Sequence, residues 1–256
     1  MLKNLIDTHC HLNSPELLNN ASELLNRAYE NGISKLVIVG CDLNDSLKAV
    51  ELADNFSQYA SIGIHPHEAK NFDSIPKEFY ELSKNNNVIA IGEIGLDYYY
   101  DNSPREIQIE MFRKQLDFSR ELNLPVILHI RDAMNDALKI LHEYSDLKLL
   151  FHCYSGGLEF LNQVLEFKSL CAFGGALTWK NSHELRETVK QIPIERLVLE
   201  TDCPYMTPIP FRGKLNEPSY VKYVYEKTSE LKNITLQELS EKININFENF
   251  FNIKNV

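Results

Sequence analysis

Short runs of apolar residues alternate with longer amphipathic segments along the chain. Eight of these runs are rich in Val, Ile, Leu and Phe and have the length of strands buried on both faces. They span residues 5–11, 35–41, 60–65, 88–94, 126–130, 147–152, 169–174 and 196–201. In the segments between them, helical spacing of apolar positions predicts helices over residues 16–31, 43–55, 106–122, 133–144, 158–167 and 182–191.

The order of these elements predicts the fold. Strands that alternate with helices form a parallel sheet, and eight such units suit a closed (β/α)8 TIM barrel. An open, doubly wound sheet is the alternative. The tail, residues 218–251, predicts two more helices, the second starting at a capping box from Thr235 to Glu238. Other candidate N-caps are Asn44 or Asp45, Ser103 and Ser182.

The chain has no linker, low-complexity tract or short repeat. Barrels of about 250 residues commonly form one domain. Residues 1–256 are therefore predicted to be a single domain.

Polar residues gather where the apolar runs end. They are His9 and His11 of the first run, His65 of the third, Glu93 of the fourth, His129 of the fifth, His152 of the sixth and Asp202 directly after the eighth. Active sites of these barrels are built at the C-terminal ends of the strands, so these side chains should meet at one mouth. His9 and His11 share a strand face, with Cα atoms roughly 6.6 Å apart.

This collection of side chains predicts a metal centre. Burying so many imidazoles and carboxylates together without cations would leave polar and charged groups unpaired. Neutral imidazole with carboxylate suits Zn, Mn, Fe or Ni ions, and Mg²⁺ less well. Six ligands exceed what one tetrahedral ion needs. The pattern therefore favours two divalent ions, Mg²⁺, Mn²⁺ or Zn²⁺, about 3.5–4 Å apart.

Charge and cysteine content narrow the partners and the compartment. The net charge is −10, whereas proteins that bind nucleic acid over their whole surface are usually basic. Any contact with nucleic acid should therefore be local, for example with a few nucleotides at the end of a DNA chain. The chain has five cysteines, an odd number, and no Cys-x-x-Cys pair, which argues against a disulfide scaffold. The N-terminus does not read as a signal peptide and no apolar run would span a membrane. We expect a cytoplasmic protein without an obligate protein partner.

Six short motifs occur in order along the chain. They are Asp7–His11 (DTHCH), Gly63–His67 (GIHPH), Gly92–Tyr98 (GEIGLDY), His129–Asp132 (HIRD), His152–Gly156 (HCYSG) and Glu200–Pro204 (ETDCP). With these motifs the chain resembles the TatD family of metal-dependent deoxyribonucleases, within the amidohydrolase superfamily, from Leu5 to about Phe251. The resemblance implies a barrel with a two-metal centre that hydrolyses phosphodiester bonds in DNA.

The resemblance also implies roles for individual residues. His9, His11 and Asp202 would hold one ion, His129 and His152 the other, and Glu93 would bridge the two. His65, Arg131 and the stretch 212–218, with Arg212 and Lys214, would face the substrate. Asp202 is the first candidate to accept a proton from the attacking water, and Glu93 is the next. Asp7 and Glu200 are candidates to orient ligands.

Two alternatives to a nuclease stay open. The same water could attack a carbonyl carbon, as in an amide, a lactone or the ester of a D-aminoacyl-tRNA, although Arg131 and the basic loop favour phosphate. The ions could instead be structural, in a binding module without activity. Structural zinc sites are closed and have about four ligands, so six ligands on a barrel rim argue against this alternative. Tyr98–Tyr100 and Trp179 could stack on bases or simply pack at the rim.

Overall fold

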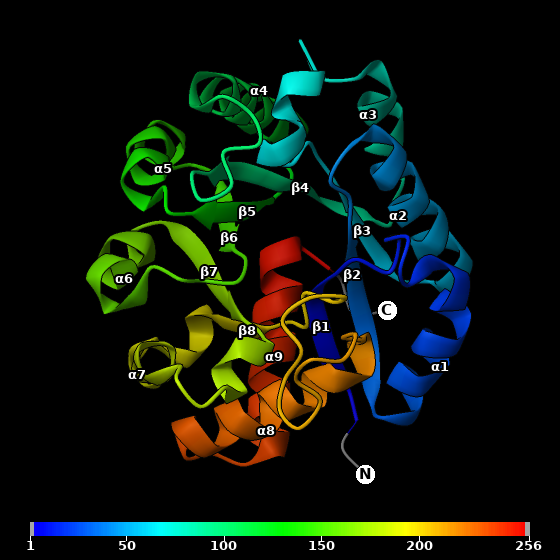
Figure 1. Cartoon of the computed structure of the whole chain (residues 1–256), viewed down its shortest axis with the longest axis vertical. Coiled ribbons are helices and arrows are strands. Elements are labelled where there is room, and N and C mark those ends of the chain that lie inside the picture. Colours follow the sequence, from blue (N-terminus) through cyan, green and yellow to red (C-terminus); the bar gives the residue numbers. More distant parts are fainter. Residues whose placement is uncertain (1–2, 254–256) are drawn as a thin grey trace.

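Eight parallel strands form one sheet in the order of the sequence (Figure 1). The structure is a computed structural model that describes residues 3–253. The strands are β1 (Leu5–Cys10), β2 (Ile33–Val39), β3 (Tyr59–Ile62), β4 (Val88–Asp97), β5 (Val126–Arg131), β6 (Lys148–Phe151), β7 (Lys168–Phe173) and β8 (Leu197–Leu199). All eight predicted strands are present.

The last strand is short, and the residues after it close the barrel. The amide of Asp202 donates to the carbonyl of His9 at 2.9 Å, and the amide of His11 donates to the carbonyl of Cys203 at 2.8 Å. These bonds join the end of β8 to β1. The predicted eight-stranded barrel is confirmed, and the open sheet is excluded.

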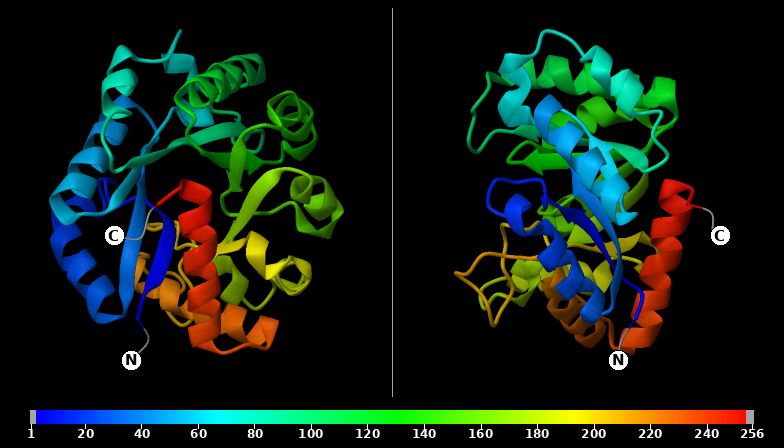
Figure 2. Two further views of the ribbon diagram at one scale, coloured as in Figure 1. Left: turned by 180° about the vertical axis from the view of Figure 1, so that it is seen from behind. Right: turned by 90° about the vertical axis from the view of Figure 1, so that its right-hand side faces the viewer.

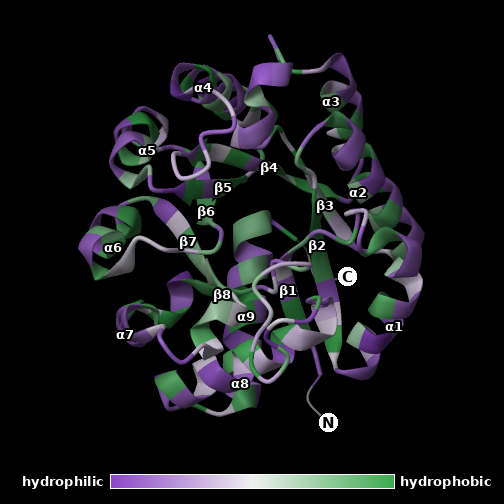
Figure 3. Cartoon of the chain, viewed as in Figure 1, coloured by the Kyte–Doolittle hydropathy of each residue, from purple (hydrophilic) through white to green (hydrophobic). Residues whose placement is uncertain are grey.

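Helices surround the barrel. They are α1 (Ala21–Glu30), α2 (Leu43–Phe56), α3 (Lys77–Leu82), α4 (Arg105–Leu122), α5 (Met134–Leu141), α6 (Gly157–Leu165), α7 (His183–Gln191), α8 (Val221–Lys232) and α9 (Leu236–Phe251). The strands are mostly hydrophobic, whereas the helices carry both hydrophobic and hydrophilic residues (Figure 3). This is the pattern expected when helices pack one face on a buried sheet. No helix within residues 3–253 is long and apolar enough to cross a membrane.

Some helix boundaries differ from the sequence prediction. The first helix begins at Ala21 and not at residue 16, because the preceding residues form a 3₁₀ turn, η1 (Leu18–Asn20). Helix α3 was not predicted, since six residues are too few to show a helical period. Ser103 does not cap α4, and its hydroxyl donates to the carbonyl of His67 instead, at 2.9 Å.

The N-caps of two helices test the capping predictions. Helix α2 is capped by Asp42, whose carboxylate accepts from the amide of Asp45 at 2.8 Å, so the prediction of Asn44 or Asp45 was wrong. Helix α9 starts as predicted, because the hydroxyl of Thr235 accepts from the amide of Glu238 at 3.2 Å. An N-cap side chain needs an oxygen that can accept from a backbone amide in the first turn of the helix. Asp42 directly precedes that turn, so its carboxylate can reach the amide.

Helix α9 covers the N-terminal end of the barrel. The side-chain amide of Asn246 donates through Nδ2 to the carbonyl of Leu197, at the start of β8, at 2.8 Å. The buried ring of Phe247 packs on Tyr59, at the start of β3, with centroids 5.7 Å apart. In the side view α9 lies on one side of the barrel, and the loop before α8 extends from the other (Figure 2). The opposite, C-terminal end is therefore the one left for a site.

Candidate metal centre

Glu93 reaches the centre of the barrel mouth because two glycines let β4 approach its neighbour closely. A Cβ at Gly92 would lie 2.6 Å from the Cβ of Ile127, and a Cβ at Gly95 would lie 1.9 Å from the carbonyl oxygen of His129. Gly95 also has a φ of +148°, which side chains disfavour. The pairing of β4 with β5 shifts register at this point. The resulting bulge aims the buried carboxylate of Glu93 inward.

Four histidines surround that carboxylate in two pairs. Glu93 Oε2 lies 3.4 Å from Nε2 of His9 and 3.7 Å from Nε2 of His11. Its other oxygen, Oε1, lies 2.7 Å from Nδ1 of His129 and 3.4 Å from Nε2 of His152. Each oxygen of one carboxylate therefore faces its own pair of imidazoles. The structure brings together all the histidines for which a ligand role was predicted.

Asp202 adds a carboxylate oxygen beside the first pair of histidines, His9 and His11. Its Oδ1 lies 3.5 Å from Nε2 of His11 and 3.9 Å from Nε2 of His9, and those two nitrogens are 3.1 Å apart. Ligand atoms that share one tetrahedral zinc ion lie about 3.4 Å apart. Asp202 has a φ of +56°, in the left-handed region that Asp tolerates better than most residues. The donors and their spacing fit a divalent cation.

Neighbours of the outer ring nitrogens orient two of these histidines. Nδ1 of His11 lies 3.2 Å from the carbonyl of Val39 in a hydrogen bond, which places the ring proton there. Nδ1 of His152 has no hydrogen-bond partner within residues 3–253, but a carboxylate oxygen of Glu200 lies 3.1 Å away and favours the ring proton on this nitrogen by its charge. In a neutral imidazole the other nitrogen then carries a lone pair, so both Nε2 atoms are ready to bind a cation. Glu200 has the orienting position predicted for it.

His129 is oriented by Asp97, a residue to which the sequence analysis gave no role. Its Nε2 lies 3.1 Å from Oδ2 of Asp97, which leaves the lone pair on Nδ1, next to Glu93. Oδ2 of Asp97 also lies 2.9 Å from Nε2 of His67. Asp97 and His67 stand within the quoted motifs, but only the folded arrangement shows that they meet. Asp7, in contrast, contacts no ring, and its carboxylate accepts from Thr201 and from the amide of His9.

His65 lies in the same cluster with the opposite proton arrangement. Its Nδ1 accepts from the amide of His67 at 3.1 Å, so the neutral ring carries its proton on Nε2. Burial and the nearby His129 hold the pKa of His65 well below its usual value, which keeps the ring neutral. Its Nε2 lies 3.8 Å from Oε1 of Glu93. His65 is therefore arranged as a donor toward the mouth and not as a ligand.

The electrostatics of the cluster favour cation binding. Burial opposes ionisation of Glu93, but His152 and His9 hold the pKa of its carboxyl well below the usual range. Asp202 is half-buried, and the same two rings together with His11 lower its pKa. Burial opposes protonation of His152, yet the carboxylates around it raise its pKa to about 10. The carboxylates are thus ionised, and bound cations would replace the protons on the rings.

Arg131 lies at the edge of the cluster. It is two residues after His129 on β5, so both side chains leave the same face of the strand. The central carbon of its guanidinium lies 4.2 Å from the ring centroid of Tyr99 and 4.7 Å from that of Tyr100. Such cation–π contacts do not consume the N–H donors of the guanidinium.

Arg212 and Lys214 lie on the exposed loop between β8 and α8. The guanidinium of Arg212 lies 4.5 Å from the ring centroid of Trp179. The ammonium of Lys214 lies 5.7 Å from the ring of Phe211. Within residues 3–253, no hydrogen bond or ion pair joins either side chain to the metal cluster, so their predicted contact with substrate stays a prediction.

Residues 6–252 match the sequence model described as TatD related DNase. The chain belongs to the TatD family. This TatD-family chain is 41% identical to Uncharacterized metal-dependent hydrolase YabD of Bacillus subtilis (strain 168), and the match covers 97% of this chain and 99% of YabD. It is 33% identical to Uncharacterized metal-dependent hydrolase YcfH of Escherichia coli (strain K12), over 97% of this chain and 96% of YcfH.

Solved structures of TatD proteins share the fold. The TatD homolog YJJV from Escherichia coli k12 has a TM-score of 0.90 at 27% identity and covers 99% of this chain and 100% of its own. A hydrolase TatD family protein from Entamoeba histolytica has a TM-score of 0.87 at 29% identity and covers 98% of both chains. The TatD-family chain is therefore a metal-dependent hydrolase on a TIM barrel.

Proposed function

We propose that this hydrolase is a deoxyribonuclease that cleaves phosphodiester bonds at DNA ends or in single strands. The observation that carries the proposal is the position of Arg131. Its guanidinium has no acidic partner among residues 3–253, and it leaves β5 on the same face as His129. A planar guanidinium matches the oxygens of a phosphate in a bidentate manner. A free guanidinium beside a metal cluster therefore favours a phosphate ester as substrate.

The proposal includes two divalent ions, Mg²⁺, Mn²⁺ or Zn²⁺. His9, His11 and Asp202 would hold one ion, His129 and His152 the other, and Glu93 would bridge them through its two oxygens. Bound in this way, the ions would supply an acidified water and neutralise charge on the phosphate oxygens.

The side chains of the cluster then divide the remaining work. Asp202 would accept the proton of the attacking water, because a carboxylate can face His9 and His11 with one oxygen, Oδ1, and take the proton on the other. His65 and Arg131 would donate hydrogen bonds to the non-bridging phosphate oxygens, where charge develops. Glu93 is the second candidate for the base.

The decisive experiment offers the enzyme both phosphodiester bonds and a carboxylic ester bond. Metal-stripped protein is reloaded separately with Mg²⁺, Mn²⁺ or Zn²⁺, the bound ions are counted, and the protein is incubated with end-labelled single-stranded DNA, duplex DNA, RNA and a D-aminoacyl-tRNA. We expect two ions per chain and shortened DNA strands. Hydrolysis of the aminoacyl ester without cleavage of any nucleic acid would overturn the proposal in favour of the carboxylic ester hydrolase.

The compartment is part of the same proposal. All five cysteines, Cys10, Cys41, Cys153, Cys171 and Cys203, are free thiols. Free thiols are usual in a reducing compartment. We propose that the protein acts in the cytoplasm, where DNA ends are accessible to it.

A further inference from the structure

Cleavage of a phosphodiester bond releases a sugar oxygen that needs a proton. The bond from phosphorus to that oxygen breaks and leaves its electron pair on the oxygen, and a positioned acid that donates a proton at this moment speeds the step. In the proposed reaction Asp202 receives a proton from the attacking water, while His65 and Arg131 contact the non-bridging oxygens. None of these three side chains supplies the proton on the leaving side.

The histidines at the mouth differ in whether they have a proton to give. Two of them lie outside the four predicted ligands, and these two are His65 and His67. The Nδ1 of His65 accepts from the amide of His67 at 3.1 Å, so loss of the proton on its Nε2 would leave an anionic ring. Arg131 does not release a proton in proteins. His67 is therefore the imidazole of the mouth that remains for acid catalysis.

His67 and Asp97 form a hydrogen-bonded dyad. His67 follows β3 at the C-terminal end of the barrel, in the 3₁₀ helix η2 (Pro66–Asn71). Its Nε2 lies 2.9 Å from Oδ2 of Asp97, whose side chain is fully buried. An ionised carboxylate only accepts hydrogen bonds, so Nε2 carries a hydrogen. The buried negative charge also stabilises a second proton on the same ring, as the aspartate of a catalytic triad does for its histidine.

The second ring nitrogen of His67 is free to exchange a proton. Within residues 3–253, Nδ1 has no hydrogen-bond partner. The side chain is 25% exposed, so a ligand can approach it. The dyad thus has the two features of an acid catalyst, a carboxylate behind the ring and an open nitrogen in front.

The ring of His67 lies against the metal cluster. Its centroid is 4.4 Å from that of His65 and 6.2 Å from that of His129. It also lies 5.4 Å from the ring of Tyr100, and the guanidinium carbon of Arg131 lies 4.7 Å from that same ring. A phosphate ester bound between Arg131 and the cluster would therefore have His67 beside it.

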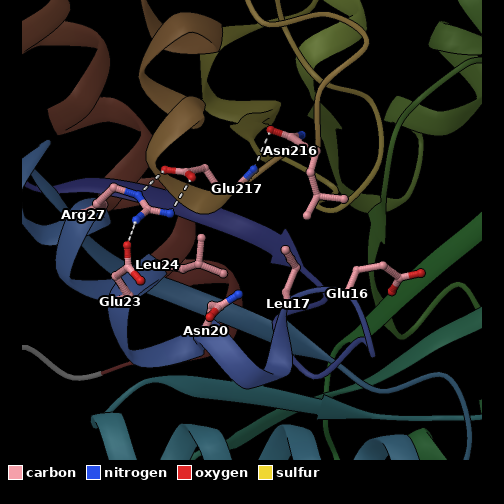
Figure 4. Close-up of a pocket in the computed structure, with 9 residues that line it drawn as sticks. Glu16, Leu17, Asn20, Glu23, Leu24, Arg27, Asn216 and Glu217 are labelled. Atoms are coloured by element: carbon pink, nitrogen blue, oxygen red, sulfur yellow. Dashed lines mark hydrogen bonds and ion pairs between the residues drawn. The ribbon is translucent and has the colours of Figure 1, made fainter.

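The cavity of about 220 Å³ between α1 and the loop before α8 offers no comparable group (Figure 4). No histidine, lysine, cysteine or tyrosine lines it. Its arginine, Arg27, is paired with Glu217 at 2.9 Å and with Glu23. These paired charges fasten the loop to α1, so a proton donor for the leaving oxygen is found with His67 and not in this cavity.

We propose that His67 is the general acid of the reaction and protonates the leaving oxygen from Nδ1. This inference rests on the proposed function and adds an acid to the base Asp202. The oxygen of the attacking hydroxide bonds to phosphorus while the bond to the sugar oxygen breaks. The sugar oxygen keeps the electron pair and takes the proton of His67. The proton that Asp202 took from water returns to His67 through the solvent, so each cleavage consumes one water.

The two residues lie at different parts of the cluster, as this division of work requires. Asp202 faces His9 and His11, whereas His67 flanks His129. In an in-line displacement the attacking and leaving oxygens are on opposite sides of phosphorus. A base beside one pair of histidines and an acid beside the other match that geometry.

Leaving groups of different basicity test this role. Bis(4-nitrophenyl) phosphate releases 4-nitrophenolate, a stable anion that needs no proton, whereas a thymidine dinucleotide releases a sugar alkoxide. His67→Gln can still donate to Asp97 but has no proton to give up. We expect its turnover of the dinucleotide to fall by at least about 10²-fold, the lower limit for general-acid catalysis, and its turnover of the nitrophenyl diester to fall far less. His183→Gln, the same change at the exposed start of α7, should alter neither reaction.

Bound metal is counted on the same preparations, and His67→Gln should hold as many ions as the wild-type protein. Equal losses of turnover on both diesters, or loss of bound metal, would show that His67 only positions His129 and would overturn the acid role. Normal turnover of the dinucleotide by His67→Gln would overturn it too. If the wild-type protein cleaves the nitrophenyl diester but not the dinucleotide, the acid role fails while phosphodiester hydrolysis stands. If it cleaves neither diester, the proposed function itself fails, and the role of His67 with it.

Discussion

At the scale of single residues, the partner of one ring nitrogen decides what the other nitrogen can do. The outer nitrogens of His11 and His152 face a carbonyl and a carboxylate, so in the neutral rings the inner nitrogens carry the lone pairs. His65 accepts an amide proton on Nδ1, so its inner nitrogen carries a hydrogen. Sequence placed all three residues at one mouth but could not separate the ligands from the donor, because the partners come from other parts of the chain.

Asp202 gives the first prediction at this scale. Asp202→Asn keeps the shape of the side chain and one weak ligand oxygen but cannot accept a proton. We expect turnover to fall by at least about 10²-fold, the lower limit for general-base catalysis. Bound metal should fall far less, because His9, His11 and Glu93 remain. Metal content and turnover are measured on one preparation, and near-normal turnover at saturating metal would move the role of base to Glu93.

His152 gives a prediction about pH. The carboxylates around it raise its pKa to about 10 from the ordinary value of 6.5, so the ring is protonated at neutral pH in the metal-free protein. That proton stabilises the metal-free fold fully below pH 6.5, and the contribution is lost as pH rises through about 10. An ion bound to Nε2 must displace the proton, so metal affinity should weaken as pH falls. Calorimetry in buffers of different ionisation enthalpy should detect proton release on binding at pH 7, and zero release would contradict this.

At the scale of elements, the end of β4 connects the metal cluster to the rim. Oδ2 of Asp97 contacts His129, and Oδ1 accepts from the amides of Tyr99 at 3.0 Å and Tyr100 at 2.9 Å. The same two rings carry Arg131. One buried carboxylate thus fixes a metal ligand and the platform of a phosphate contact.

Asp97→Asn tests this connection. The amide can still accept from Tyr99 and Tyr100 but no longer offers an anion to His129. We expect metal affinity to fall about 10–100-fold, as is typical when a carboxylate behind a ligating histidine is removed. Asp101→Asn, in the adjacent exposed segment, loses only a surface pair with Arg105 and should bind metal normally. Equal metal affinity in both variants would show that Asp97 does not act through His129.

Helix α9 gives a matched pair of stability predictions. Phe247 is fully buried against the start of β3, whereas Ile245, two residues earlier, is 52% exposed. Phe247→Ala should lower the free energy of unfolding by about 3–5 kcal/mol, because it opens a cavity. Ile245→Ala should change it by no more than about 0.5 kcal/mol. Urea unfolding of both variants measures the difference, and similar midpoints would mean that α9 is not part of the core.

What sequence could predict also depends on the element. The strands were found because each is a compact run of apolar residues, and such runs follow from burial on both faces. Helix α3 was missed because it has too few residues to show a period. Asp97 was missed because its partners come from elsewhere in the chain, His67 from the 3₁₀ helix after β3 and His129 from β5, and only the folded barrel brings them together.

At the scale of the whole molecule, the position of the site could be predicted from the order of the strands and from the polar residues at their ends. Polar residues at the ends of successive parallel strands can meet only if the sheet closes, and the bonds from Asp202 and His11 close it. The net charge of −10 gave no sign of an anionic substrate. The reason to propose one came from Arg131, which has no acidic partner within residues 3–253, and that is a property of the folded chain.

The cover that α9 forms over one end of the barrel has a consequence for how a long substrate would be processed. Side chains fill the interior of such a barrel. Within residues 3–253, a DNA strand therefore has no path through the molecule and must enter and leave the site from the C-terminal end of the barrel. An enzyme of this shape cannot encircle DNA as a ring-shaped nuclease does. We therefore expect it to dissociate from the DNA after each cleavage. With labelled DNA in large excess, all strands should shorten together. Fully digested strands beside untouched ones would instead show that the enzyme stays on its substrate.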